Sequence, residues 1–155
     1  MTDKWSLIDG DRINAAGFKW ATSLLQGKHI VIADDNNSVL RWLKFTLEDY
    51  GTKVYIFEHG RDTIDFLSQH MPIDVLILDI IMNEIGGLEI AAFSKANLPN
   101  TPILFLTGCQ CTSNESVEAS QFGTVIQKPV GLEDMISNIM TAIEPSWEKQ
   151  YLANA

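Results

Sequence analysis

The stretch Asp74-Val-Leu-Ile-Leu-Asp79 is the most apolar run of the chain, and a carboxylate lies at each of its ends. Apolar residues that follow one another without alternation are typical of a central parallel strand covered on both faces. The second carboxylate, Asp79, falls at the carboxyl end of this predicted strand. Ligands of open parallel sheets bind at that end, so the run predicts a buried strand that ends in a functional group.

Shorter apolar runs recur on both sides of this stretch and alternate with segments of helical periodicity. We expect strands at residues 30–33, 53–57, 74–79, 103–107 and 124–127, and helices at 39–47, 61–69, 88–98, 115–121 and 132–143. Such alternation implies parallel strands joined by right-handed crossovers, with helices on both faces of the sheet. The predicted fold class is therefore α/β, with an open, doubly wound sheet of five strands.

The composition indicates a globular protein and excludes several classes. The chain has 155 residues, 46% hydrophobic and 20% charged, and its net charge of -9 argues against direct nucleic-acid binding. Acids near the start and the lack of an apolar run of about 18 residues argue against a signal peptide or a membrane span. Cys109 and Cys111 are too few and too close for a disulfide framework. We therefore expect a cytoplasmic protein that binds no membrane.

The ends of the predicted strands carry polar side chains, namely Asp34, Asp35, Asp79, Thr107 and Lys128. Three carboxylates at one edge of a sheet repel each other unless a cation shares the site, and Mg2+ prefers such oxygen ligands. A carboxylate nucleophile, a divalent ion, a lysine and a hydroxyl together are what phosphoryl transfer onto an aspartate requires. The alternative is a helix cap with scattered polar groups at strand ends.

Four segments in this order make the chain resemble the receiver domains of two-component response regulators. They are Ile30-Val-Ile-Ala-Asp-Asp35, Val75-Leu-Ile-Leu-Asp79 with Gly86-Gly87-Leu88-Glu89, Ile103-Leu-Phe-Leu-Thr107-Gly108, and Val125-Ile-Gln-Lys-Pro-Val130. The resemblance covers residues 29 to about 143. It implies the flavodoxin-like strand order 2-1-3-4-5 and reversible phosphorylation of Asp79 by a histidine kinase or a histidine phosphotransfer protein.

The resemblance also implies a Mg2+ site. Asp79 would be both the phosphoacceptor and a metal ligand, and Asp35 would bind the ion directly. Asp34 would act mainly through water, and the backbone carbonyl of Ile81 would be a further protein ligand.

Further roles follow from the same resemblance. Thr107 would hydrogen-bond a phosphoryl oxygen after the reaction. Lys128 would pair with Asp79 before the reaction and with the phosphoryl group afterwards, and a cis peptide bond before Pro129 would aim it. Val125 occupies the switch position.

Three positions depart from the family pattern. Asn83 stands where a proline is usual, Gly108 replaces the more usual alanine, and Val125 replaces Tyr or Phe at the switch position. Without an aromatic ring there, the usual coupling of Thr107 to an aromatic rotamer cannot operate as such, although a smaller displacement could. Asn83 and Val125 keep open a pseudo-receiver, a structural or dimerisation module that is never phosphorylated. A metal-dependent phosphatase would need an acid where the chain has Ile81.

The segments outside the resemblance suggest a division into an N-terminal extension (1–27), a receiver domain (28–144) and a short C-terminal tail (145–155). Residues 11–26 have apolar residues at helical spacing, which predicts an amphipathic helix. We expect it to pack through Trp20 and Leu24 on the receiver or on a second copy of the chain, and the alternative is a frayed tail.

Four aromatic residues outside the main pattern carry further expectations. Trp42 and Phe45 lie off the apolar stripe of their helix, so they are either an exposed patch for a partner or covered from within the chain, where the N-terminal extension is the candidate cover. Trp147 and Tyr151 are candidates to anchor the tail.

The sequence predicts a stand-alone receiver, because only a dozen residues follow Ile143. Such a protein would not be an enzyme in the usual sense, since its chemistry is self-phosphotransfer and slow dephosphorylation. It would signal by phosphorylation-dependent contact with a downstream protein. The alternative is a receiver fragment of a longer regulator.

Overall fold

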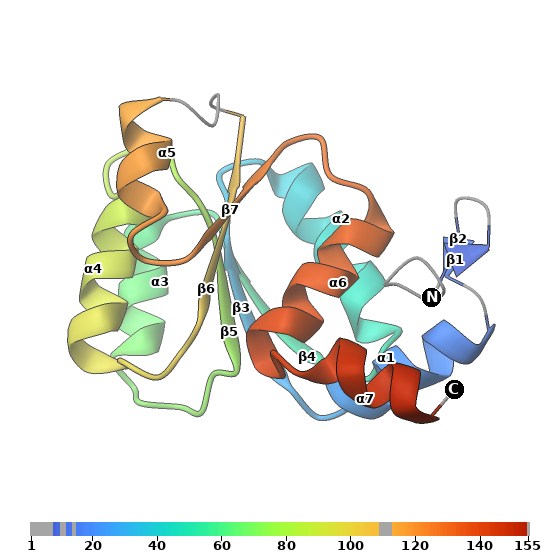
Figure 1. Cartoon of the computed structure of the whole chain (residues 1–155). Coiled ribbons are helices and arrows are strands. Elements are labelled where there is room, and N and C mark those ends of the chain that lie inside the picture. The colour runs from blue at the N-terminus through green and yellow to red at the C-terminus, as the bar shows by residue number, and fades with distance from the viewer. Residues whose placement is uncertain (1–7, 10–11, 14, 109–112, 155) are drawn as a thin grey trace.

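A five-stranded parallel sheet forms the centre of the computed structural model, which describes residues 8–9, 12–13, 15–108 and 113–154 (Figure 1). Its strands are β3 (His29–Ala33), β4 (Lys53–Phe57), β5 (Val75–Asp79), β6 (Ile103–Thr107) and β7 (Thr124–Gln127). They lie in the order β4-β3-β5-β6-β7. Counted along the chain, this is 2-1-3-4-5, so the predicted fold class is confirmed.

The central strand is the apolar run that dominates the sequence. All five residues of β5 are buried, and the strand pairs in parallel with β3 on one side and β6 on the other. Ile77 lies beside Ile32 of β3 and Leu104 of β6. A strand with two neighbours and two covered faces offers no position for a polar side chain except its end, where Asp79 lies.

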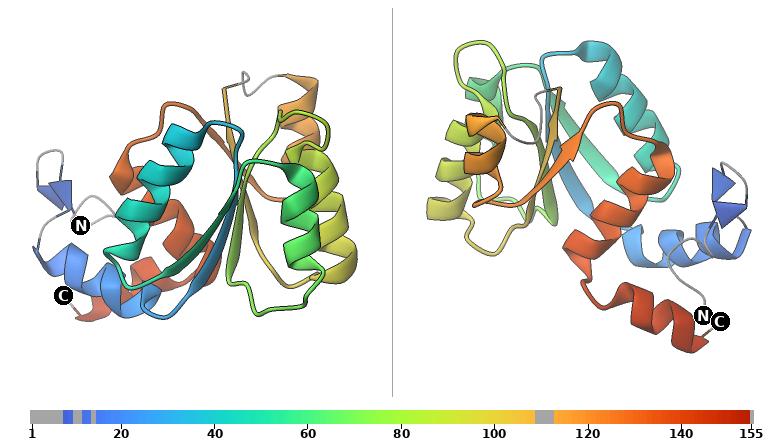
Figure 2. Two further views of the ribbon diagram at one scale, coloured as in Figure 1. Left: turned by 180° about the vertical axis from the view of Figure 1, so that it is seen from behind. Right: turned by 45° about the horizontal axis from the view of Figure 1, so that its top comes forward.

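Helices cover both faces of the sheet, as the alternating pattern predicts (Figures 1 and 2). One face carries α3 (Gly60–Leu67), α4 (Gly87–Asn97) and α5 (Asn114–Ala119). The other carries α2 (Asn37–Glu48), α6 (Leu132–Ile143) and, beside them, α1 (Ala15–Leu25) and α7 (Trp147–Asn154). Alternate strand residues divide between two cores, so that Ile30 and Ile32 face one helical layer while Val31 and Ala33 face the other.

The N-terminal helix is present and packs on the receiver of its own chain. Ala21 and Leu25 of α1 are buried in the core beneath α2 and α6, and Trp20 and Leu24 pack against that core. The Phe18 ring lies 5.0 Å from the ring of Tyr50, which follows α2. A helix with buried core residues is not a frayed tail.

The start of this helix differs from the prediction. Residues 12–13 form β2 (Arg12–Ile13), which pairs antiparallel with β1 (Ile8–Asp9), and α1 begins at Ala15. Apolar spacing alone cannot separate a short hairpin from the first turn of a helix, because both can place apolar residues at such intervals.

Of the two alternatives for Trp42 and Phe45, the structure shows the exposed patch, and within the described residues the N-terminal extension does not cover them. The Trp42 residue is 40% exposed and Phe45 is 76% exposed. The buried side of α2 consists of Leu40, Leu43 and Leu47. The ring of Phe18 in α1 contacts Tyr50, which lies beyond the end of α2 and away from Trp42 and Phe45. The two aromatic residues therefore remain open to partners.

The C-terminal tail is a helix and is anchored as expected. Trp147 is fully buried, and its indole Nε1 donates a hydrogen bond to Thr141 Oγ1 at 2.9 Å. The rings of Tyr151 and Trp20 meet edge to face at 5.7 Å, so α7 also contacts α1. Among the described residues, no helix has the length and apolar character needed to cross a membrane.

Trp147→Ala should lower the free energy of unfolding by about 3–5 kcal/mol, because it leaves a large cavity in the core and removes the hydrogen bond to Thr141. Urea unfolding followed by circular dichroism measures the loss. Leu152→Ala, on the exposed side of the same helix, serves as control and should change stability by about 0.5 kcal/mol or less. Equal losses in both variants would contradict the anchoring role of Trp147.

Candidate functional site

An acidic cluster lies at the carboxyl edge of the sheet, where β3 and β5 end side by side. Ala33 pairs with Leu78, so the next residues, Asp34 and Asp79, are neighbours on adjacent strands. Asp34, Asp35 and Asp79 each offer a carboxylate oxygen within 4.8 Å of the others. Asp34 and Asp79 are buried and Asp35 is exposed. The three predicted carboxylates are therefore brought together.

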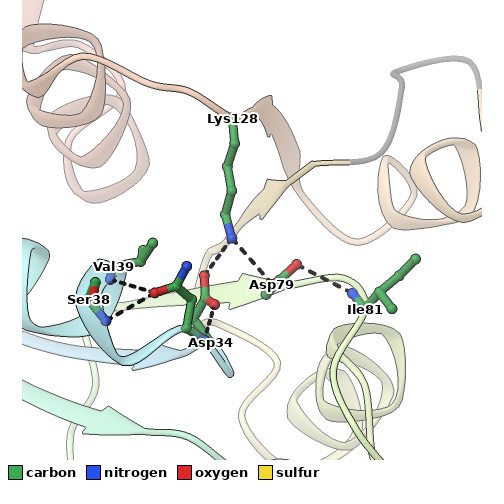
Figure 3. A network of polar contacts seen from close by, with 7 residues as sticks. Asp34, Ser38, Val39, Asp79, Ile81 and Lys128 are labelled. Carbon is green, nitrogen blue, oxygen red and sulfur yellow. Dashed lines mark hydrogen bonds and ion pairs between the residues drawn. The ribbon is translucent and has the colours of Figure 1, made fainter.

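Lys128 joins this cluster from the loop after β7 (Figure 3). Its ammonium nitrogen lies 2.7 Å from Asp34 Oδ2 and 3.3 Å from Asp79 Oδ2. The expected partner was Asp79, and the structure adds a shorter contact to Asp34. The Lys128–Pro129 peptide bond is cis, as the family resemblance implied.

Burial and charge set the protonation of these groups. Burial and, next to it, the neighbouring Asp34 carboxylate raise the pKa of Asp79 to about 6, against the opposing effects of Lys128 and the Ile81 backbone N–H. For Lys128, burial by itself lowers the pKa. The hydrogen bonds and charges of Asp34 and Asp79 outweigh burial, so the pKa of Lys128 lies above its ordinary value. The site thus holds a charged Lys128 beside the Asp79 carboxyl group, whose ionisation is less favourable than that of an exposed aspartate.

Asn36 fixes Asp34 and the start of α2 at the same time. The backbone N–H of Asn36 donates to Asp34 Oδ1 at 2.8 Å. Its side-chain oxygen accepts from the backbone N–H groups of Ser38 at 3.0 Å and Val39 at 3.3 Å, which caps the helix. The sequence signals the cap through the run of polar residues after β3, but it does not reveal the bond to Asp34.

A second support was not predicted from the sequence. The amide of Asn37 donates to the carboxylate of Glu58, which follows β4. This contact ties the first turn of α2 to the neighbouring strand end, next to Asp35. No local pattern connects residues 21 positions apart, so only the fold could reveal it.

Thr107 and Gly87 complete the surroundings of the phosphoacceptor candidate. Thr107 ends β6 and is buried, and its carbonyl accepts a 2.7 Å hydrogen bond from the backbone N–H of Lys128. A Cβ on Gly87 would lie 2.1 Å from the carbonyl oxygen of Asp79. Gly87 therefore lets α4 begin directly against the end of β5. Any residue with a Cβ at this position would clash with the Asp79 backbone.

The loop after β5 contains the other predicted ligand. The backbone N–H of Ile81 lies 3.4 Å from Asp79 Oδ1, and the Ile81 side chain is exposed. Asn83, in the usual place of a proline, is exposed as well. The role of the Ile81 carbonyl as a metal ligand stays a prediction.

Two further predicted features concern the neighbourhood of Thr107. Val125 of β7 is partly buried and packs against the core that contains Phe105. A Cβ on Gly108 would meet no other atom within 4 Å, so this glycine leaves open space beside the site. Cys109 and Cys111 lie outside the described residues.

The donor set fits Mg2+. Three carboxylates that can each place one oxygen near a common point match the hard oxygen ligands that this ion takes, with water completing an octahedron. Two of the carboxylates are buried, and Lys128 supplies only one positive charge against three negative ones. A divalent cation would balance the remaining charge.

The chain matches the family model described as response regulator receiver domain over residues 30–140. It is 33% identical over 113 residues to the response regulator receiver protein CpdR of Brucella abortus, covering 72% of this chain and 93% of CpdR. It is 29% identical over 112 residues to the response regulator MprA of Mycolicibacterium vanbaalenii. That match covers 71% of this chain but only 48% of MprA.

Solved structures agree with the sequence comparison. A response regulator receiver domain protein from Clostridium thermocellum is 26% identical and superposes with a TM-score of 0.70, covering 81% of this chain and 98% of the other. A CheY-like receiver domain protein from Methanospirillum hungatei, at 24% identity, superposes with a TM-score of 0.71 and supports the fold. The chain belongs to the family of response regulator receiver domains, the signalling modules of two-component systems that interact with histidine kinases or phosphotransfer proteins.

Proposed function

We propose that this chain is a stand-alone receiver that accepts a phosphoryl group on Asp79 in a Mg2+-dependent reaction. The donor is a histidine kinase or a histidine phosphotransfer protein, and the phosphorylated receiver signals by binding a downstream protein. The observation that carries the proposal is the Lys128 ammonium between the carboxylates of Asp34 and Asp79. This arrangement supplies a nucleophile and a positive charge where a phosphoryl group would bind.

The residues of the chain act in phosphoryl transfer as follows. A carboxylate oxygen of Asp79 attacks phosphorus, and the bond from phosphorus to the histidine nitrogen breaks as the imidazole leaves. Lys128 donates to a phosphoryl oxygen, and the Thr107 hydroxyl binds another after transfer. Mg2+, held by Asp34, Asp35, Asp79 and the Ile81 carbonyl, would neutralise charge on the phosphoryl oxygens.

The pseudo-receiver remains the second candidate, and Val125 together with Asn83 favours it. Val125 offers no aromatic ring to move when Thr107 moves. The geometry of Asp34, Asp79 and Lys128 weighs against it, because a module without phosphorylation has no need to bury two carboxylates beside a lysine. Burying such a cluster costs stability, and a function in phosphoryl transfer accounts for its presence.

Several finer points belong to this proposal. We place the receiver at residues 28–144, between the extension 1–27 and the tail 145–155. The protein would act in the cytoplasm, and its only chemistry would be self-phosphotransfer and autodephosphorylation. The match to nearly the whole of CpdR is in line with a stand-alone receiver. A homodimer through α1 stays a prediction, which sedimentation of the intact chain tests. Helix α1 already packs on its own receiver through Ala21 and Leu25.

Incubation with Mg2+ and acetyl phosphate should add one phosphoryl group to the intact chain and none to Asp79→Asn. The asparagine amide lacks the nucleophilic oxygen, so intact-protein mass spectrometry separates the two cases. Asp62→Asn, an exposed acid of α3, is the matched control and should be modified like the intact chain. If the intact chain gains no mass and binds no beryllofluoride in the presence of Mg2+, the pseudo-receiver is correct.

The raised pKa of Asp79 predicts how the metal-free protein responds to pH. The ordinary value is 3.8 and the folded value about 6, so folding favours the protonated carboxyl. This contribution is fully present below pH 3.8 and is lost as the pH rises through about 6. At about pH 7.5, Asp79→Asn should therefore be more stable than the intact chain by about 1–2 kcal/mol, after allowance for solvent screening.

Urea unfolding in EDTA measures this difference. The advantage of Asp79→Asn should shrink as the pH is lowered to about 4, where the aspartic acid is protonated in the folded chain. Asp62→Asn again serves as control and should show no such change. If the stability advantage of Asp79→Asn is the same at both pH values, ionisation of Asp79 does not destabilise the folded chain and the prediction is wrong.

A further inference from the structure

An apolar patch lies on the exposed face of α2, the helix that follows the acidic pair at the end of β3. Phe45 is 76% exposed and Trp42 is 40% exposed, although both side chains are large and aromatic. Single exposed apolar residues are common, but two large rings one helical turn apart form a joint surface that favours a binding partner. Helix α1 packs near Tyr50 and leaves this surface open.

The apolar surface continues from Trp42 toward the end of β7. Trp42 lines a pocket of about 370 Å³, whose other lining residues come from α2, from β6 and from the segment after β7: Val39, Leu106, Lys128, Pro129 and Val130. All of them except Lys128 are apolar. The surface that a partner can remove from water is therefore wider than the two exposed rings.

Opposite charges flank the centre of the patch at equal spacing. Arg41 lies four residues before Phe45 and Asp49 lies four residues after it, and all three are exposed. Asp49 keeps a helical backbone conformation as the C-cap of α2, so the three residues form one row along the same face of the helix. Neither Arg41 nor Asp49 forms an ion pair with another described residue.

We propose that this face of α2 binds the same face of a second copy of the chain, so that the protein forms a symmetric dimer. A two-fold axis places the same surface on both sides of the interface, and each contact across it occurs twice. With the axis at Phe45 and the two helices antiparallel, Arg41 of each copy lies beside Asp49 of the other. The row thus carries the complementary charges that a second copy needs.

The common rules of helix packing accommodate this arrangement. Residues spaced by four form ridges, and two helices that pack through such ridges cross at about -50°, the commonest class in globular proteins. The ion pair between Lys44 and Glu48, at 3.0 Å, can persist within each copy. Because one helix from each copy supplies most of the contact, we expect an interface near or below the lower limit of stable complexes, about 1,200 Å². The dimer should therefore dissociate on dilution.

Sedimentation equilibrium of the full chain should show a monomer that becomes a dimer as the protein concentration rises. Arg41→Asp should raise the dissociation constant about tenfold, because each dimer loses two pairs of opposite charge and gains two pairs of like charge. Asp49→Arg should do the same for the same reason. The double variant with both substitutions restores the opposite charges, so its dissociation constant should return to within about threefold of that of the intact chain.

Asp62→Arg is the matched control, because it changes the net charge as Asp49→Arg does but lies on α3, in the other helical layer. It should leave the dissociation constant unchanged. Phe45→Ala removes the ring at the axis from both copies and should weaken the dimer about tenfold or more. Thermal melting establishes that each variant is folded.

Three results would overturn the proposal. The chain could stay monomeric at every concentration, which would leave the patch to a partner of another kind. The dimer could be insensitive to Arg41→Asp and Phe45→Ala, which would place the interface on another surface, such as α1. The double variant could fail to restore the dimer, which would refute the pairing of Arg41 with Asp49. None of these measurements involves phosphorylation, so the proposed function stands or fails separately.

Discussion

The ammonium of Lys128 between the carboxylates of Asp34 and Asp79 is the interaction on which the site depends. It joins groups from the ends of three strands at one edge of the sheet, and it does so where both carboxylates are buried. Without the lysine, two negative charges would lie side by side in a poorly solvated position, at a cost of several kcal/mol. The parallel sheet is what makes the meeting possible, since all its carboxyl ends share one edge.

The sequence predicts those parts of the fold that depend on local pattern. The apolar run of β5 identifies the central strand, and the residues that follow each strand identify the acidic cluster and Lys128. It does not predict contacts that depend on packing between distant elements. The exposure of Trp42 and Phe45, the bond from Asn36 to Asp34, and the hairpin before α1 all arise from how elements meet.

The terminal helices make the core larger than the segment that matches the family. Ala21, Leu25 and Trp147 lie outside residues 30–140, yet they are buried in the core beneath α2 and α6. They thicken one helical layer at the end away from Asp79, where Phe18 of α1 meets Tyr50 beyond the end of α2 and Trp147 bonds Thr141 of α6. The exposed part of α2, with Trp42 and Phe45, stays open on the same layer.

In the proposed function, Val125 would change how a signal leaves the site. In a receiver with an aromatic switch residue, a ring can move into the space that Thr107 vacates, but a valine side chain is too short for that. Thr107 is also bonded through its carbonyl to the backbone N–H of Lys128 at 2.7 Å. We therefore expect a shift of Thr107 to move the backbone that carries Lys128, Pro129 and Val130, and these residues lie beside Val39 and Trp42 of α2. The hydrogen bond between Thr107 and Lys128 thus connects the end of β6 to the surface beside α2.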